Sequence, residues 1–240
     1  MPAIPILMYH NIARPPGGVR LRSLYLPPRR FAAQMRLLSL GGYRALSLRD
    51  ALPYLQGKQE DKVVVLTFDD GYQDNVEEAL PILERHGFTA TCFVVSGALG
   101  GHNHWDAEQL GTRKAVMDRN ALQAWVAAGM EVGAHTRAHP RLPQLPYPAA
   151  KAEIRGSKED LENLLGQEVC TFAYPYGAMD RRERDLVQQS GFLAAVTTQR
   201  GRARVGQDLW TLPRISVGGH HLPHVFPLQL WTGYEDRHRR

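Results

Sequence analysis

The sequence has few cysteines and no long hydrophobic run. Among its 240 residues are two cysteines, Cys92 and Cys170, each inside a short apolar stretch. They do not have the spacing of a zinc site, so we expect two free, buried thiols and exclude a disulfide scaffold or a zinc finger. No apolar segment approaches the roughly 20 residues that a membrane-spanning helix needs.

The amino-terminal segment also lacks the pattern of a secretory signal peptide, which is a basic stretch followed by a long apolar core. The apolar run near the start, "IPILM", is too short for that role. These absences predict a cytoplasmic protein whose contact with a membrane is at most peripheral.

The net charge of +5 comes from basic residues that are spread along the chain. No basic stripe interleaved with aromatic residues is present, and no nucleic-acid-binding motif is evident. We therefore expect no nucleic-acid partner. The length is typical of one α/β domain, so we expect a single catalytic domain over residues 1–240.

Short apolar or β-branched runs alternate with segments of helical periodicity. Helices are expected at 29–40, 74–86, 119–128, 148–165 and 181–190, and Pro81 should kink the second of them. The expected strands are 4–9, 43–48, 62–68, 89–95, 130–135, 169–174, 193–198 and 213–217. Seven or eight strand–helix units of this kind predict a parallel (β/α) barrel in preference to an open sheet.

Reactive side chains follow several of these runs at their carboxyl ends. In a (β/α) barrel those ends meet at one mouth, where the chemistry of such proteins is found. The residues in question are His10, Asp69, Asp70, His135, His139, Tyr174 and Tyr176.

Two of these stretches together indicate a metal site. Adjacent carboxylates at a buried strand end, such as Asp69 and Asp70, are costly without a cation, and they point in different directions. His135 and His139 are four residues apart in "HTRAH" and can face one ion. Either stretch alone has a simpler interpretation, a helix-capping turn or surface histidines, but the combination favours an Asp-His-His metal site.

The motifs "TFDDGY", "HTRAHP" and "AYPYG" resemble, in order and spacing, those of the polysaccharide deacetylases of carbohydrate esterase family 4, the NodB-homology domain. The resemblance implies a distorted (β/α) barrel and metal-dependent removal of N-acetyl groups from a sugar. It implies that Asp69 is the general base and that Asp70, His135 and His139 hold the metal, commonly Zn²⁺. The backbone N–H of Tyr176 would help to polarise the acetyl oxygen.

The sequence departs from this family in its third motif, where Ala173 stands in place of an arginine that orients the base. Arg214, at the start of the last expected strand, is our candidate for the missing cation, and a surface ion pair is the alternative. Asp208 and Trp210 weakly resemble the fourth motif, in which Trp210 would contact substrate or belong to the core.

The acid histidine of the family's fifth motif has two possible sources here. His220, His221 and His224 lie in a glycine-rich stretch that is typical of a loop. The stretch "MYH" is similar to that of a subset, the deacetylases of poly-N-acetylglucosamine-type polymers, which carry the acid histidine near the amino terminus. We therefore predict that His10 is the acid, placed across a bound acetamide from Asp69.

Aromatic residues near these motifs are candidates for contact with sugar. Segment 100–118 is a long polar insertion in which Trp105 is a predicted stacking platform, beside Asp106, or else a packed aromatic residue. Tyr174 is the other candidate, together with Trp210.

The sequence thus predicts a carbohydrate N-deacetylase. Its substrate would be an N-acetylated sugar or polysaccharide, or a membrane-bound lipid-linked sugar that a cytoplasmic enzyme can reach. Two alternatives remain open, a hydrolase of small amides on the same fold and a non-catalytic glycan-binding barrel.

Overall fold

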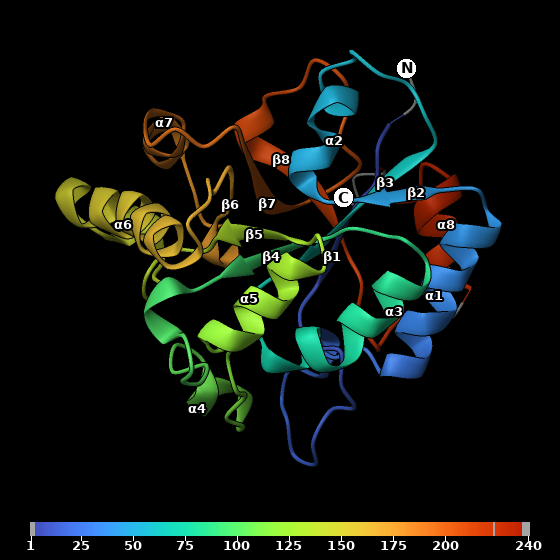
Figure 1. Cartoon of the computed structure of the whole chain (residues 1–240), viewed down its shortest axis with the longest axis horizontal. Helices are drawn as coiled ribbons and strands as arrows, with labels where there is room; N and C mark the ends of the chain where they lie inside the picture. The colour runs from blue at the N-terminus through green and yellow to red at the C-terminus, as the bar shows by residue number, and fades with distance from the viewer. Residues whose placement is uncertain (1–2, 223, 237–240) are drawn as a thin grey trace.

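The computed structural model describes residues 3–222 and 224–236, and in them the chain forms a closed parallel barrel (Figure 1). Seven strands close the barrel through pairing of β1 with β3, and β2 is an additional strand on β3. The strands are β1 (Ile6–Tyr9), β2 (Arg44–Leu46), β3 (Val63–Phe68), β4 (Thr91–Val94), β5 (Glu131–Ala134), β6 (Thr171–Ala173), β7 (Ala194–Arg200) and β8 (Leu212–Ser216). Each expected run overlaps one of these strands, although β7 and β8 extend beyond their runs, so the predicted barrel is confirmed.

Helices surround the barrel, as Figure 1 shows for α1, α3, α5 and α6. The α-helices are α1 (Pro28–Leu40), α2 (Leu48–Leu55), α3 (Leu80–Arg85), α4 (Ala107–Leu110), α5 (Arg119–Ala127), α6 (Tyr147–Leu165), α7 (Arg181–Gln189) and α8 (Val225–Trp231). Short helical turns are η1 (Arg22–Leu24), η2 (Asn75–Ala79), η3 (Ser96–Ala98), η4 (Leu142–Gln144), η5 (Pro175–Gly177) and η6 (Leu209–Thr211). The periodicity predicted α1, α5, α6 and α7 but missed α2, whose interior contains Pro53.

The expected helix 74–86 is divided in the structure. Residues Asn75–Ala79 form a π-helical turn, and a regular α-helix continues over Leu80–Arg85. Pro81 has no N–H to donate, and it lies in the first turn of α3, where that donor is not needed. The predicted kink therefore takes the form of a change of helix type between Ala79 and Leu80.

The alternation of side chains along the strands divides the core into two layers. On β3, Val64, Leu66 and Phe68 pack in the cluster that includes residues of α1, α5 and α6. Val63 and Val65 pack in the second cluster, together with Ile6 of β1, Leu212 of β8 and residues of α2. The strand residues of the second cluster thus line the inside of the barrel, and the odd-numbered positions of β3 face it.

The register of β1 against β3 sets the level at which both strands leave the barrel. Tyr9 pairs with Phe68, and the backbone N–H of Asp69 donates to the carbonyl of Tyr9 at 3.0 Å. His10 and Asp69 therefore follow their strands side by side.

Two further predictions are confirmed by the structure or agree with it. Cys92 and Cys170 are both free and buried, as expected. Among the described residues, we find no helix that is both long enough and apolar enough to cross a membrane.

A buried carboxylate, Glu131, lies in the barrel wall at the start of β5. Its two oxygens accept hydrogen bonds from the Thr91 hydroxyl at 2.6 Å, the Thr171 hydroxyl at 2.7 Å and the backbone N–H of Arg49 at 3.0 Å. Burial raises the pKa of Glu131 above its usual value, and these hydrogen bonds only partly oppose the shift. The network ties β4, β5, β6 and the start of α2 together.

We expect Glu131→Gln to change how stability depends on pH. Because the folded-state pKa is raised, the folded protein retains the proton that the unfolded chain releases above about pH 4.3, and its free energy of unfolding falls as pH rises from there. The neutral glutamine removes this loss, so the stability of the variant relative to the parent should rise between pH 4 and pH 7. Urea unfolding at both pH values measures this difference, with the exposed Glu84→Gln as control. A constant difference would contradict the prediction.

Candidate active site

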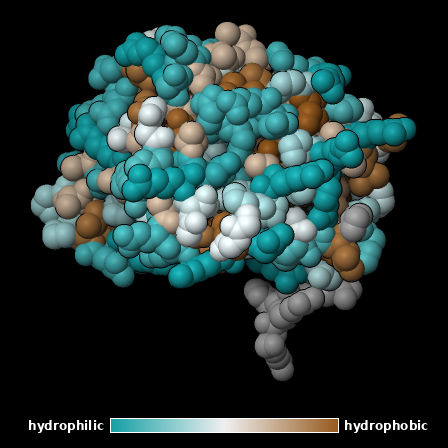
Figure 2. Space-filling model, turned by 90° about the horizontal axis from the view of Figure 1, so that it is seen from below, coloured by the Kyte–Doolittle hydropathy of each residue, from teal (hydrophilic) through white to brown (hydrophobic). Residues whose placement is uncertain are grey.

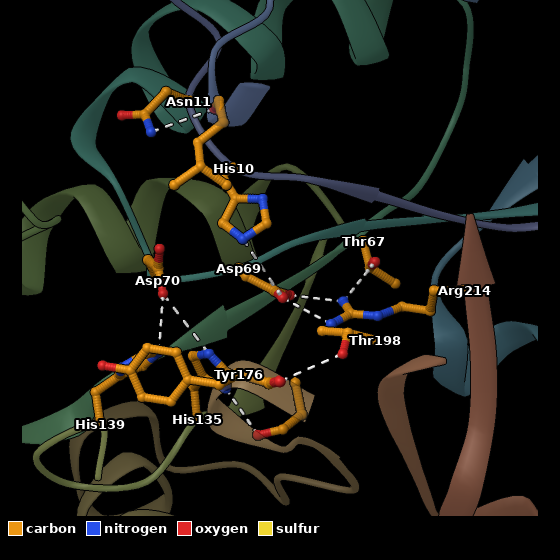
Figure 3. Close-up of polar contacts among 12 residues, drawn as sticks. His10, Asn11, Thr67, Asp69, Asp70, His135, His139, Tyr176, Thr198 and Arg214 are labelled. Atoms are coloured by element: carbon orange, nitrogen blue, oxygen red, sulfur yellow. Dashed lines mark hydrogen bonds and ion pairs between the residues drawn. The ribbon is translucent and has the colours of Figure 1, made fainter. Parts of the chain in front are cut away.

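Three polar side chains point into the barrel interior toward the carboxyl ends of the strands, because side chains alternate between the two faces of each strand. Asp69 continues the inward positions of β3, His10 continues those of β1, and Arg214 occupies an inward position on β8, two residues after Leu212. Figure 3 shows His10 and Arg214 approaching Asp69 from different directions.

Arg214 holds Asp69 through a bidentate contact. Its Nη1 and Nη2 atoms donate to Oδ1 and Oδ2 of Asp69, both at 2.7 Å, and Nη1 also donates to the Thr67 hydroxyl at 3.1 Å. The Nε–H donates to the carbonyl of Thr197 at 2.8 Å, and the arginine is only 1% exposed. The guanidinium is therefore fixed at every donor group, in the planar geometry that suits a carboxylate.

The charge of Asp69 is maintained despite its burial. Burial alone would raise the pKa of this carboxyl group, but the charge and the hydrogen bonds of Arg214 outweigh that effect, and the pKa lies below its usual value. The side chain is thus an ionised carboxylate in the neutral pH range. An ionised carboxylate can accept a proton, and Asp69 depends on Arg214 to remain ionised inside the barrel.

Asp70, His135 and His139 lie together beside Asp69 (Figure 3). The Nε2 atoms of His135 and His139 are 3.6 Å and 3.4 Å from Oδ1 of Asp70, and one ligand atom from each residue lies within 4.8 Å of the others. Zinc–ligand bonds of about 2.0–2.1 Å in a tetrahedral arrangement place ligand atoms roughly 3.3 Å apart. The separations to Asp70 are close to that value.

The chemistry of the three side chains also fits a divalent cation. Burial lowers the pKa of His135 to about 4, so its imidazole is neutral at neutral pH, as a metal ligand must be. Its Nδ1 is 2.7 Å from the carbonyl of Ala173, a contact that leaves Nε2 directed at Asp70. All three residues are buried. The site could therefore hold a metal through one carboxylate and two imidazoles.

Unusual backbone conformations concentrate at this site. Among the described residues, four that are not glycine have a positive φ angle: Asp70 at 75°, Thr136 at 65°, His139 at 57° and Tyr176 at 59°. Such angles are costly for residues with a Cβ and persist where the surrounding structure enforces them, often at functional sites. The positive φ of Asp70 ends the regular alternation of side chains along β3. The Asp70 side chain therefore points neither to the same side as Asp69 nor directly to the opposite side.

His10 points toward Asp69, with 4.0 Å between its Nε2 and Oδ2 of the aspartate. This side chain is 17% exposed and therefore has access to solvent at the barrel mouth. From the sequence we predicted these two groups on opposite sides of an acetamide. A gap of 4.0 Å leaves no room for such a group, so they lie side by side because Tyr9 and Phe68 are paired in register.

His220, His221 and His224 lie in or next to the loop that follows β8. The rings of His220 and His221 are 3.8 Å apart, and Arg30 donates to the carbonyls of Gly219 and His221. The histidine that the structure places within 4.0 Å of Asp69 is His10.

Trp105 and Tyr176 both contact the His139 ring. Trp105 stacks on it with 4.9 Å between ring centroids, and Tyr176 meets it edge-on at 4.6 Å. Tyr176 is 39% exposed, and its carbonyl accepts a hydrogen bond from Thr198 at 3.3 Å. The insertion 100–118 thus reaches the Asp-His-His group through Trp105.

Two predicted sugar-contacting residues, Tyr174 and Trp210, are used in packing instead. Tyr174 is fully buried, and its hydroxyl donates to the carbonyl of Trp210 at 3.0 Å. The indole N–H of Trp210 donates to the carbonyl of Phe192 at 2.8 Å, and the Arg184 guanidinium lies over its ring. Their polar atoms are bonded within the wall formed by β7, η6 and α7. Tyr174 therefore packs where we predicted contact with sugar, and Trp210 follows the packing alternative.

Sequence reasoning missed two neighbours of the site, Asp74 and Asn75. Both belong to the same string "TFDDGYQDN" that contains the two aspartates, and both are buried. A pair of polar residues at the start of an expected helix is usually assigned to capping, and that assignment concealed their contacts with the segment after β1.

The segments that follow β1, β3 and β4 gather on the lower side of Figure 1, and Figure 2 views the molecule from that side. This face is mostly hydrophilic, with small hydrophobic areas scattered over it (Figure 2). Such a surface suits a polar ligand better than an apolar one.

Known proteins share both the sequence and the fold. The sequence profile of the polysaccharide deacetylases matches residues 56–195. YxkH of Bacillus subtilis (strain 168), which is named as a polysaccharide deacetylase, is 31% identical over 89% of this chain and 71% of its own length. The poly-β-1,6-N-acetyl-D-glucosamine N-deacetylase of Staphylococcus aureus is 22% identical over 86% of this chain and 72% of its own.

Among solved structures, the Streptococcus pyogenes deacetylase PplD, determined in complex with acetate, superposes with a TM-score of 0.80. It is 27% identical, and the match covers 95% of this chain and 98% of that chain. The profile match spans more than half of the described barrel and includes the Asp69–Asp70 pair and both histidines of the Asp-His-His group. The chain therefore belongs to the polysaccharide deacetylase family, as the motifs predicted.

Proposed function

We propose that this protein is a metal-dependent hydrolase that removes N-acetyl groups from an amino-sugar-containing glycan. The observation that supports this most directly is the Asp69 carboxylate, which Arg214 keeps ionised between His10 and the Asp70-His135-His139 group. A proton acceptor, a proton donor and a cation site within one mouth are what amide hydrolysis requires.

The substrate class follows from two features of the chain. The relative from Staphylococcus aureus is named for the N-deacetylation of poly-β-1,6-N-acetyl-D-glucosamine. The "MYH" stretch puts a histidine at the end of the first strand, next to Asp69. We propose that this chain belongs to the subset with the amino-terminal acid histidine and that its substrate carries N-acetylated hexosamines, in a polymer or on a lipid carrier.

In the proposed mechanism, Asp70, His135 and His139 would hold a divalent cation, Zn²⁺ being our choice. When bound, such a cation polarises the acetyl carbonyl group and makes water more acidic. Asp69 accepts the proton of the water molecule that attacks the acetyl carbon. Arg214 fixes the orientation of Asp69, and the backbone N–H of Tyr176 would stabilise the oxygen of the tetrahedral species.

His10 completes the reaction by donating a proton to the nitrogen of the leaving sugar amine. The carbon–nitrogen bond then breaks, and acetate and the free amine are released. Trp105, stacked on His139, would form one wall of the sugar site and hold that imidazole in place.

Removal of the metal is expected to lower the rate of acetate release from β-1,6-linked N-acetylglucosamine oligomers at least about a hundredfold, because the carbonyl group is no longer polarised. Activity should return when Zn²⁺ is added. His135→Ala should bind less zinc by elemental analysis than the parent, and His86→Ala, at a surface position on the outer wall, should bind the same amount.

Three results would contradict the proposal. Acetate release that survives complete removal of bound metal would show that the Asp-His-His group has another role. A metal-loaded protein that releases acetate from a small cyclic or linear amide, but from no N-acetylated glycan, would favour the small-amide hydrolase. Binding of glycan without acetate release would favour a non-catalytic barrel.

A further inference from the structure

The backbone around His10 is held by two side chains from the turn after the Asp69–Asp70 pair. Asn75 Nδ2 donates to the carbonyl oxygen of His10 at 2.8 Å, and Asp74 Oδ1 accepts the backbone N–H of Ile12 at 3.0 Å. The two side chains also join each other, with 3.2 Å between Asn75 Nδ2 and Asp74 Oδ1. The two side chains thus hold the backbone on either side of Asn11, at His10 and at Ile12.

A lysine from the insertion 100–118 completes this arrangement. Lys114 Nζ lies 2.7 Å from Oδ2 of Asp74, and its own backbone is fixed by Asn103, whose Oδ1 accepts the Lys114 N–H at 2.6 Å. Burial raises the pKa of Asp74, and the charge of Lys114 opposes that shift. Asp74 accepts hydrogen bonds from one backbone N–H and one side-chain amide, and a buried carboxylate also needs a nearby cation to offset the cost of burying its charge.

Asp74 and Asn75 are held in place by burial. Asn75 is fully buried, and the exposed fraction of Asp74 is 7%. Both lie at the junction with the π-helical turn η2, which directs them toward the end of β1 rather than toward solvent. Such turns are frequent at functional sites because they reorient side chains.

We propose that Asp74, Asn75 and Lys114 form a clamp that sets the position of the His10 imidazole relative to Asp69. The clamp residues are positioning residues. Asn75 and Asp74 contact the backbone of His10 and Ile12 and not the imidazole ring, and Lys114 acts through Asp74. This inference rests on the proposed function, in which His10 delivers the proton to the leaving amine. It also gives the insertion 100–118 a role in catalysis that is separate from contact with sugar.

The reason for such a clamp lies in the topology. His10 is the first residue beyond β1, so the barrel sheet no longer fixes it. A catalytic group that moves by about 1 Å can lose on the order of a hundredfold in rate. The loop after β1 therefore needs anchors, and the turn after β3 is the neighbouring segment, because β1 and β3 are paired.

The test compares two substrates with different leaving groups. An N-acetylated sugar releases an amine, which must be protonated, whereas 4-nitrophenyl acetate releases a phenolate, which needs no proton. Asn75→Ala should lower kcat on the N-acetylglucosamine oligomer roughly 10- to 100-fold, with KM unchanged. The rate on the aryl ester should change less than about threefold, because general acid catalysis is not required there.

Three further variants and two controls make the outcome specific. His10→Ala should show the same dependence on the leaving group to a greater degree. Lys114→Met should show it to a smaller degree and Lys114→Arg should restore activity, which provides a second test if Asn75→Ala does not fold. Asn120→Ala and Lys58→Met, both at exposed positions, should match the parent on both substrates.

The failures can be told apart. Equal losses on both substrates for the clamp variants, or a change in KM alone, overturn the clamp, provided that His10→Ala depends on the leaving group. If His10→Ala itself lacks that dependence, the proposed acid role of His10 is wrong, and the clamp falls with it. Zinc content equal to that of the parent in every variant confirms that the comparison reports on proton delivery.

Discussion

Asp69→Asn is expected to lower the rate of N-acetyl hydrolysis by about 10²- to 10⁴-fold, the range that general base catalysis contributes. Asparagine has nearly the shape of aspartate, but its amide group does not accept a proton from water. One oxygen remains to accept from Arg214, but the other guanidinium nitrogen then faces the amide NH2 group and the buried arginine loses its counter-charge. We therefore expect the variant to be less stable as well, and urea unfolding of the same samples shows that it is folded where kcat is measured. The measurement is kcat on N-acetylglucosamine oligomers, with bound zinc determined in the same samples.

The zinc content of Asp69→Asn should equal that of the parent, because the Asp-His-His group uses Asp70 and not Asp69. Asp61→Asn is a matched control, since Asp61 pairs with Arg44 at 3.0 Å on the surface. It should leave kcat unchanged. A variant at position 69 that keeps a tenth or more of the parental rate would exclude Asp69 as the base.

Arg214→Met is expected to destabilise the fold strongly as well as to inactivate it. The change leaves the Asp69 carboxylate buried without its cation, and breaking a buried ion pair from one side costs about 3–5 kcal/mol. It also removes the donors to Thr67 and Thr197. Urea unfolding should show the loss, and kcat should fall because the base is no longer oriented.

Two other variants define this effect. Arg214→Lys keeps the charge but not the planar, bidentate fork, so we expect it to be intermediate in both stability and kcat. Arg44→Met removes the surface partner of Asp61 and should change stability little, because exposed ion pairs contribute little. If Arg214→Met were no less stable than Arg44→Met, the pair with Asp69 would not be the structural support that we describe.

The position of Arg214 shows what a motif can and cannot reveal. The sequence indicates that an arginine is missing at Ala173, and Arg214 was the candidate because it begins a strand. In the barrel, β1 lies between β3 and β8. Arg214, a long side chain on an inward position of β8, reaches past β1 to Asp69, and the distance that it spans depends on barrel closure.

The positions of Tyr174 and Trp210 illustrate the opposite case. Both belong to recognisable motifs. From sequence, Tyr174 was expected to contact sugar, and Trp210 was expected either to contact it or to belong to the core. Tyr174 instead continues the outward face of β6 into the helical layer, where it meets Phe172 with 5.2 Å between ring centroids. An aromatic residue in a motif packs or binds according to its side of the strand, and the motif does not specify that side.

The sequence by itself determined the class of fold, the positions of the strands along the chain, and the family, because hydrophobic periodicity and motif spacing are local properties of the chain. It also determined which residues stand at the strand ends, including His10, Asp69 and Asp70. Only the tertiary structure decided how these groups meet. The 4.0 Å approach of His10 to Asp69, the positive φ of Asp70 and the anchoring of the β1 loop by Asn75 all result from closure of the barrel. Closure brings together segments about 60 residues apart in the chain, and their contacts depend on strand register and packing rather than on local sequence.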